Sequence, residues 1–297
     1  MISRMMDTTR FALGENADQY TVAALRIFLF SAWAIRFGLE PLSDLGFLDP
    51  ALFTHQGLMI LVPHFVIAAL TSPAALLIYK VVLVGALVAA AVGIKPKASS
   101  IIALALLTFT IGFMKGYGGH VNHRELTLLY CGYLLPFLPV YEVWCVNKQP
   151  ATEDKRLYQF TVLALCLIVV LQYVFVGLAR VCMGSPAVFH PETMWGWIIN
   201  HAMRMNPLGS PVGVFVLETP ILKYMMGPAI FLSTILELLA PCMFFIRQNF
   251  VRIFVVAFVG FHLSIFATMN ILFLENMLAL VFFFDLAYFF RPSHAKA

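Results

Sequence analysis

The chain has 297 residues, of which 61% are hydrophobic and 11% charged, and its mean hydropathy is +0.89. Soluble domains are about 45–50% apolar and about 25% charged, so this composition excludes a water-soluble globule. The formal charge of +4 comes from 19 Lys and Arg against 15 Asp and Glu. No basic tract is interleaved with aromatic residues, so nucleic acid is not an expected partner.

Long apolar runs dominate the chain. A membrane span needs roughly 20 mostly apolar residues. The runs predict an all-α, polytopic transmembrane helical bundle with about eight spans (seven to nine), forming a single domain over residues 1–297. The predicted spans lie near residues 20–39, 72–94, 98–115, 124–146, 157–180, 227–246, 252–270 and 272–290.

The apolar stretch 53–70 is harder to interpret. His55, Pro63 and His64 interrupt it. Because proline breaks helices and polar side chains are costly in hydrocarbon, we expect a re-entrant or interfacial helix here. A ninth span is the alternative.

The placement of Lys and Arg predicts the orientation. If the N-terminus is inside, the inner segments carry most of the basic residues, whereas the outer loop 40–71 contains three acidic residues and neither Lys nor Arg. This distribution follows the positive-inside rule. Both termini are therefore expected to be cytoplasmic. The membrane is expected to be a bacterial cytoplasmic membrane.

Several ionisable residues fall inside predicted spans, where each costs about 2.5–3.5 kcal/mol on insertion scales. We interpret Arg26 and Asp285 as a structural pair or as snorkelling side chains. The other polar residues come from at least four spans and fall in the outer half of the bilayer, where we expect them to line a cavity that opens to the outer face. Its candidate residues are Lys80, Asn122, His123, Arg180, Glu237 and His262.

The densest polar cluster is GYGGHVNHRE at residues 116–125. Its glycines allow the backbone to bend before the fourth predicted span and leave room for a ligand. His120 and His123 are three residues apart, near enough on a helix to share a metal. One such pair falls short of the several histidine boxes of membrane di-iron enzymes, so we expect no metal site.

Five segments together resemble one membrane family. They are LRIF at 25–28, VNHREL at 121–126 before a helix ending in LPFLP at 135–139, QYVFVGLAR at 172–180, LEL at 236–238 and FHL at 261–263. In order and spacing, this set is similar to the membrane domain of the vitamin K-dependent gamma-glutamyl carboxylase. Bacterial proteins called HTTM, for horizontally transferred transmembrane domain, share that domain.

The resemblance implies a quinone chemistry. The family's carboxylase deprotonates a reduced vitamin K, which reacts with oxygen to give a strong base, and carbon dioxide then adds to a substrate glutamate. An Asn-His pair helps to hold the quinone, and Asn122 and His123 match it. His262 matches a family histidine on a later span. The resemblance thus implies a reduced quinone, of the vitamin K or ubiquinol type, as the cofactor.

The sequence departs from the family at the lysine that acts as the catalytic base. Where the family has Gly-x-x-Lys, this chain has Gly177-Leu178-Ala179-Arg180. Arginine does not release its proton in proteins, whereas a buried lysine can be tuned to neutrality. Arg180 therefore suits binding of a quinol anion, and Lys80 or His123 becomes the candidate base. A different quinol- or oxygen-dependent reaction, or a loss of catalysis, remains open.

Two other functions fit the sequence. A non-catalytic partner in peptide maturation or export would use the outer segment 192–205 as an interfacial docking helix. Trp195, Trp197 and His201 belong to that segment, and His190 lies just before it. Aromatic residues are enriched at this membrane level. A small transporter is the third possibility, although the sequence shows no internal repeat.

Overall fold

A computed structural model describes residues 17–118, 125–184, 186–202 and 210–289. The described part is helical and contains no strand. Its α-helices are α2 (Gln19–Leu39), α3 (His64–Leu70), α4 (Pro73–Val92), α5 (Pro96–Gly118), α6 (Leu126–Leu134), α7 (Arg156–Met183), α8 (Pro191–Ala202), α9 (Pro211–Glu218), α10 (Pro220–Leu238), α11 (Gln248–Met269) and α12 (Leu274–Ala279). Short 3₁₀ helices join or extend several of them.

Six of these helices are long and apolar enough to cross a membrane, namely α2, α4, α5, α7, α10 and α11. They present large apolar side chains to the surroundings: Val81 of α4 is 66% exposed, Leu232 of α10 64% and Val256 of α11 70%. A soluble protein rarely exposes faces of this kind, but lipid covers them without cost. The expected helical membrane protein is therefore supported by both length and surface.

Two predicted spans are shorter than expected. The run 124–146 contains α6 and the 3₁₀ turn Leu135–Phe137, because Pro136 and Pro139 cannot continue the helical ladder. The run 272–290 is divided into α12, a 3₁₀ turn over Leu280–Phe283 and another over Leu286–Phe289. Asp285 caps this last turn by accepting a hydrogen bond from Ala287 N at 3.1 Å.

The sixth predicted span, 227–246, is displaced along the chain. Helix α10 begins at Pro220, which suits the first helical position because proline needs no hydrogen-bond partner for its nitrogen. The helix ends at Leu238, and a 3₁₀ turn over Ala240–Phe244 follows at Pro241. The expected helix thus exists, but prolines set both of its ends.

Contacts divide the chain into two compact units, each described here by itself. Among the described residues, unit 1 contains those within 166–283, and unit 2 contains those within 17–165 and 284–289. Helix α7 is shared between them. The expectation of a single HTTM-like domain stays a prediction.

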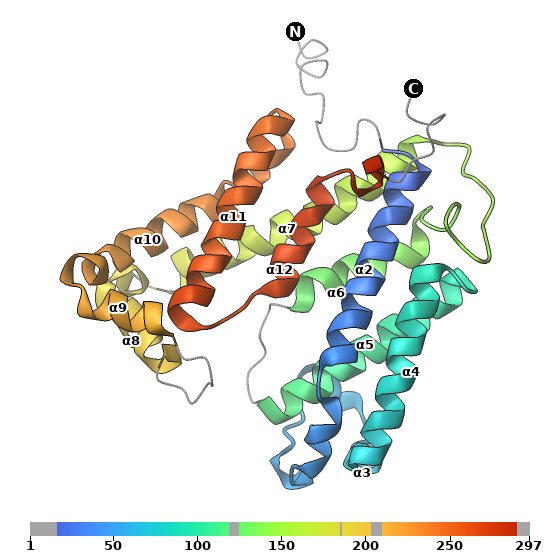
Figure 1. The fold of residues 1–297 in the computed structure, drawn as a ribbon, viewed down its shortest axis with the longest axis horizontal. Helices are drawn as coiled ribbons and strands as arrows, with labels where there is room; N and C mark the ends of the chain where they lie inside the picture. Colours follow the sequence, from blue (N-terminus) through green and yellow to red (C-terminus); the bar gives the residue numbers. More distant parts are fainter. Residues whose placement is uncertain (1–16, 119–124, 185, 203–209, 290–297) are drawn as a thin grey trace. The chain divides into compact units, whose positions relative to one another are not determined.

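In unit 2, α2 packs against α4 and α4 against α5, as Figure 1 shows. Asp18 caps α2 by accepting hydrogen bonds from Tyr20 N at 3.1 Å and Thr21 N at 2.9 Å. Helix α4 begins after Ser72, which caps Ala75 N, and ends at Gly93, whose φ of 74° closes the helix in the left-handed region. The connection between α4 and α5 is therefore tight.

The stretch 53–70 forms no helix of spanning length. It contains 3₁₀ turns and the seven-residue α3, so the alternative of a ninth span is wrong for this segment. The stretch packs against α5 instead. Phe53 occupies the space where a Cβ on Gly116 would lie, Met59 does the same at Gly112, and Thr54 N donates to Gly116 O at 2.9 Å. The GxxxG face of α5 thus contacts its own chain.

In unit 1, α8 packs against α9, α10 and α11, and α10 contacts α9. A small apolar core joins them, centred on Met194, Ile198, Val216, Ile230 and Met269. Ser210 tightens the arrangement by donating to the carbonyl oxygens of Ala267 and Thr268 at 2.8 and 2.7 Å. The expected helix in the segment 192–205 is confirmed as α8 up to Ala202, and Met194 and Ile198 are its buried residues. Residues 203–205 lie outside the described residues.

Candidate functional site

A charged pair of side chains joins α7 to α10. Arg180 Nη1 donates to Glu237 Oε2 at 2.5 Å and lies 3.5 Å from Thr234 Oγ1. The Glu237 side chain is 2% exposed and that of Arg180 18%. A charged pair inside hydrocarbon is costly unless both members are neutralised by each other. Two of the six candidate site residues are therefore brought together.

Gly177 explains how α7 and α10 come close enough for this pair. A Cβ at Gly177 would lie 3.1 Å from the Leu238 side chain and 3.3 Å from that of Glu237. Small residues at helix contacts in membranes allow this approach of the backbones. Gly177 and Arg180 are separated by one helical turn, so the glycine brings the arginine within reach of the carboxylate.

A second polar pair joins α7 to α11. Tyr173 OH and His262 Nε2 are 3.0 Å apart. Both side chains are almost fully buried, and the Tyr173 ring stacks on Phe258 with centroids 4.0 Å apart. His262 is thus placed among aromatic rings, with its Nε2 held by a phenol.

The two pairs belong to one polar cluster of unit 1, formed by Tyr173, Arg180, Glu237 and His262. Tyr173, Gly177 and Arg180 have the spacing i, i+4, i+7 and share one face of α7. The Arg180 guanidinium also lies 5.8 Å from the Phe261 ring centre, next to His262. Tyr173 is not among the site residues predicted from the sequence, although its spacing from Arg180 indicates a shared helix face.

Lys80, the candidate base, lies in unit 2 on α4. Its Nζ donates to the carbonyl oxygen of Glu40, just after the end of α2, at 2.8 Å. A cation at a helix C-terminus is favourable because the last carbonyls carry partial negative charge. This contact gives Lys80 a capping role. Because Lys80 belongs to a different unit from Arg180, Glu237 and His262, the common cavity stays a prediction.

Other charged groups surround that end of unit 2. The side chain of Glu125 forms ion pairs with Lys115 at 3.1 Å and with Arg36 at 3.6 Å. Glu125 is only 3% exposed. Arg36 is also 3.8 Å from Glu40. The buried carboxylate thus joins the ends of α2 and α5. Asn122 and His123, the remaining candidates, lie outside the described residues, as do His120 and Arg124.

Arg26 has a structural role, but with partners that differ from the expected one. Its side chain is fully buried, and it donates to Val140 O at 2.8 Å, to Trp144 O at 2.7 Å and to Cys145 Sγ. Asp285 accepts instead from Thr21 Oγ1 at 3.2 Å. Arg26 therefore fastens the loop after α6 to α2.

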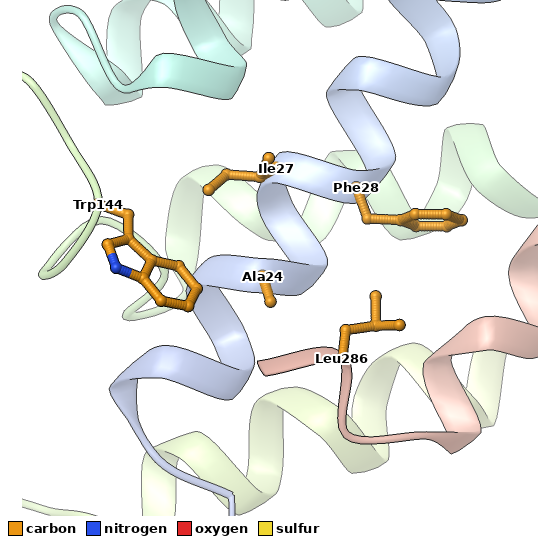
Figure 2. A pocket seen from close by; sticks show the side chains of 5 residues that line it. All are labelled: Ala24, Ile27, Phe28, Trp144 and Leu286. Atoms are coloured by element: carbon orange, nitrogen blue, oxygen red, sulfur yellow. The ribbon is translucent and has the colours of Figure 1, made fainter. Parts of the chain in front are cut away.

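That loop forms one wall of an apolar groove in unit 2. Figure 2 shows Trp144 and Leu286 on either side of α2, together with Ala24, Ile27 and Phe28. The groove has a volume of about 590 Å³. The five labelled side chains are apolar except for the indole N–H, so the groove suits an apolar guest.

The two tryptophans of α8 have different roles. Trp195 Nε1 donates to Lys223 O at 2.7 Å, and Lys223 Nζ lies 3.9 Å from the ring centre. Trp197, by contrast, is 43% exposed. His190 pairs with Glu192 at 3.2 Å, and His201 belongs to the last turn of α8. Trp195 holds α8 to α10, and Trp197 is available for contact.

Within the described residues, no group of three or more His, Cys, Asp or Glu side chains has the arrangement of a metal site. His55 and His64 form a pair at 2.9 Å in the stretch 53–70. A pair alone provides two ligands, fewer than protein zinc or iron sites require.

Neither a family model, nor a curated protein, nor a solved structure matches the chain. The fold and the long apolar helices define the class of protein. It is a multi-pass helical membrane protein with a buried polar cluster.

Proposed function

We propose that this protein binds a reduced quinone at the polar cluster of unit 1 and oxidises it with oxygen, as the resemblance to the HTTM and vitamin K-dependent carboxylase membrane domain implies. The observation that carries the proposal is the Arg180–Glu237 pair beside the Tyr173–His262 pair on membrane-spanning helices. Polar groups at this depth are expensive and usually functional. The proposed setting is a bacterial cytoplasmic membrane.

The side chains of the cluster fit a quinone head group. Such a ring needs a few polar contacts and apolar or aromatic walls. The Arg180 guanidinium offers five N–H donors that suit an anionic oxygen, and the His262 imidazole has a ring nitrogen that can accept a proton. Phe258 and Phe273 flank His262 and Tyr173. A reduced quinone would supply the electrons and the acidic hydroxyl.

In this proposal each residue has a distinct role. Arg180 binds the deprotonated hydroxyl, and Glu237 fixes the guanidinium by accepting its hydrogen bond. His262, held by Tyr173, receives the proton. Lys80 and His123 are the alternative bases, and Asn122 and His123 are the residues that the family resemblance assigns to quinone binding. Carboxylation of a peptide or protein at the outer face would be a further step.

The test is aerobic oxidation of reduced vitamin K and of ubiquinol by the purified protein in lipid. We expect Arg180→Gln and His262→Phe to abolish turnover, and Arg180→Lys to raise it, because lysine can act as a base. The exposed Arg252→Gln is the matched control and should keep full activity. His123→Ala and Lys80→Gln identify the base if His262→Phe remains active.

Two results contradict the proposal. Turnover that survives in both Arg180→Gln and His262→Phe would exclude the cluster as the site. A wild-type protein that neither oxidises nor binds a quinone would exclude the function and leave the resemblance as one of sequence pattern alone.

A docking role is the second candidate, supported by Trp197 of α8, which is 43% exposed. A peptide or partner protein at the outer face would contact this side of α8. Trp197→Ala should then abolish peptide maturation or export and leave quinol oxidation unchanged. Trp195→Ala is unsuited to this test, since Trp195 holds the helix itself.

A further inference from the structure

The groove beside α2 lies on a membrane-spanning helix. Ala24, Ile27 and Phe28 have the spacing i, i+3, i+4 and form one stripe on the first half of α2 (Figure 2). Because α2 is long enough to cross the bilayer, this stripe is at hydrocarbon depth. The guest that such a groove meets first is a lipid chain.

The end of α2 that carries the groove also carries a basic rim. Helix α4 runs back along α2, so that the turn after α4 and the loop after α6 lie together. Val146 N donates to Val92 O at 3.0 Å, and Lys95 N donates to the Asn147 side chain at 2.9 Å. Lys95 and Lys148 are therefore neighbours of the segment that carries Trp144.

The two segments that form this rim carry basic residues and no acidic ones. Segments 93–97 and 144–149 contain three lysines and neither Asp nor Glu, and Lys95, Lys97 and Lys148 are exposed. Glu142 is directed elsewhere, since it accepts from Tyr158 OH at 2.5 Å and from Thr152 N at 2.8 Å. A positive rim next to an apolar groove is complementary to an anionic lipid.

We propose that unit 2 binds one anionic phospholipid, with an acyl chain in the groove of Ala24, Ile27, Phe28, Trp144 and Leu286 and the phosphate between Lys95 and Lys148. Lipid tails are as apolar as the groove, so the chain alone gains little by leaving the bilayer. Selectivity therefore comes from the head group. Arg26 supports the site by donating to Trp144 O.

The experiment measures quenching of tryptophan fluorescence by brominated lipids. The full-length protein is reconstituted in phosphatidylcholine vesicles that contain either brominated phosphatidylglycerol or brominated phosphatidylcholine at equal content. The difference between wild type and Trp144→Phe isolates the signal of Trp144. We expect the anionic brominated lipid to quench Trp144 more strongly than the neutral one.

Two charge variants separate the rim from the overall charge. Lys95→Gln/Lys148→Gln should reduce the apparent affinity for the anionic lipid, by about fivefold for each lysine. Arg247→Gln/Arg252→Gln removes two exposed cations from unit 1 and should leave the preference intact. A third variant, Ala24→Phe, fills the groove and should abolish strong quenching by either lipid.

Equal quenching by the two brominated lipids would overturn the proposal, as would a preference that persists in Lys95→Gln/Lys148→Gln. Loss of the preference in the Arg247→Gln/Arg252→Gln control would assign the effect to net charge and also contradict it. Unchanged quenching in Ala24→Phe would place the lipid outside the groove. All four results are independent of quinol oxidation.

Discussion

Two arginines inside membrane-spanning helices solve the same electrostatic problem differently. In unit 2, fully buried Arg26 donates to two backbone carbonyl oxygens and a thiol of one loop. In unit 1, partly buried Arg180 donates to the carboxylate of Glu237 on a neighbouring helix. The first arrangement fixes a backbone in place. The second holds a charge pair at a helix contact.

This comparison teaches that a charge in an apolar helix does not by itself mark an active site. Backbone carbonyls of an irregular loop need donors when they are buried, and a long cationic side chain supplies several at once. A buried carboxylate is not required by the backbone, because an ion pair can be replaced as a whole by two apolar residues. The Arg180–Glu237 pair therefore requires a functional explanation more than Arg26 does.

The largest expected effect is on unit 2. Arg26→Met leaves the carbonyl oxygens of Val140 and Trp144 without their donor, at a cost of about 3 kcal/mol or more. We expect loss of the folded monomer, measured by size-exclusion chromatography after heating in detergent. The exposed Arg252→Gln should behave as wild type. A wild-type melting profile for Arg26→Met would contradict the role of Arg26 as a fastener.

The next largest effect concerns the ion pair. Glu237→Leu or Arg180→Met alone strands one buried charge and should destabilise the protein by about 2–3 kcal/mol. The double variant Arg180→Met/Glu237→Leu should recover most of that loss, and it should still fail to oxidise quinol. A double-mutant cycle of melting temperatures measures the coupling. Additive losses would mean that the pair does not interact.

A smaller effect tests the helix contact. Gly177→Val forces a side chain against Leu238 and Glu237 and should cost about 1–3 kcal/mol. Gly85→Val in α4 is the matched control, because no atom lies within 4 Å of a Cβ built there. Thermal unfolding of both variants checks the prediction. Equal losses at the two sites would show that α7 and α10 are not in close contact at Gly177.

The smallest effect appears at alkaline pH. Burial raises the pKa of Tyr141 from 10.0 to about 12, and the bond to Ser100 Oγ at 2.7 Å opposes part of that rise. The pKa of Tyr141 is higher in the folded state than in the unfolded state. Its contribution to the free energy of unfolding is therefore complete below pH 10 and is lost as the pH rises toward 12.

Tyr141→Phe should cost about 1 kcal/mol at neutral pH by removing the hydrogen bond to Ser100. It should also flatten the alkaline part of the stability profile, measured as melting temperature against pH. An alkaline decline identical to that of wild type would assign the effect to another group.

Part of the candidate site was readable from the sequence. Glu237 and His262 stand out as polar residues in apolar runs, and Arg180 falls at a helical spacing from Tyr173 that predicts a shared face. The pairing of Arg180 with Glu237 could not be predicted, because nothing in the sequence of α7 specifies which helix packs against it. For Lys80, an isolated lysine in an apolar run suggested a base, which stays a prediction. The contact of its Nζ with the Glu40 carbonyl oxygen after the end of α2 could not be predicted from the sequence.

The sequence by itself determined the six long apolar helices, because hydrocarbon forces each segment to satisfy its backbone hydrogen bonds locally. Length and hydropathy did not decide every predicted span, since the runs 124–146 and 272–290 form shorter helices. The tertiary structure alone decided where the short segments go. Phe53 and Met59 fill the GxxxG face of α5, and Arg26 binds a loop more than a hundred residues away in sequence. Such contacts depend on shape and on unpaired carbonyl groups, and both exist only after the helices have packed.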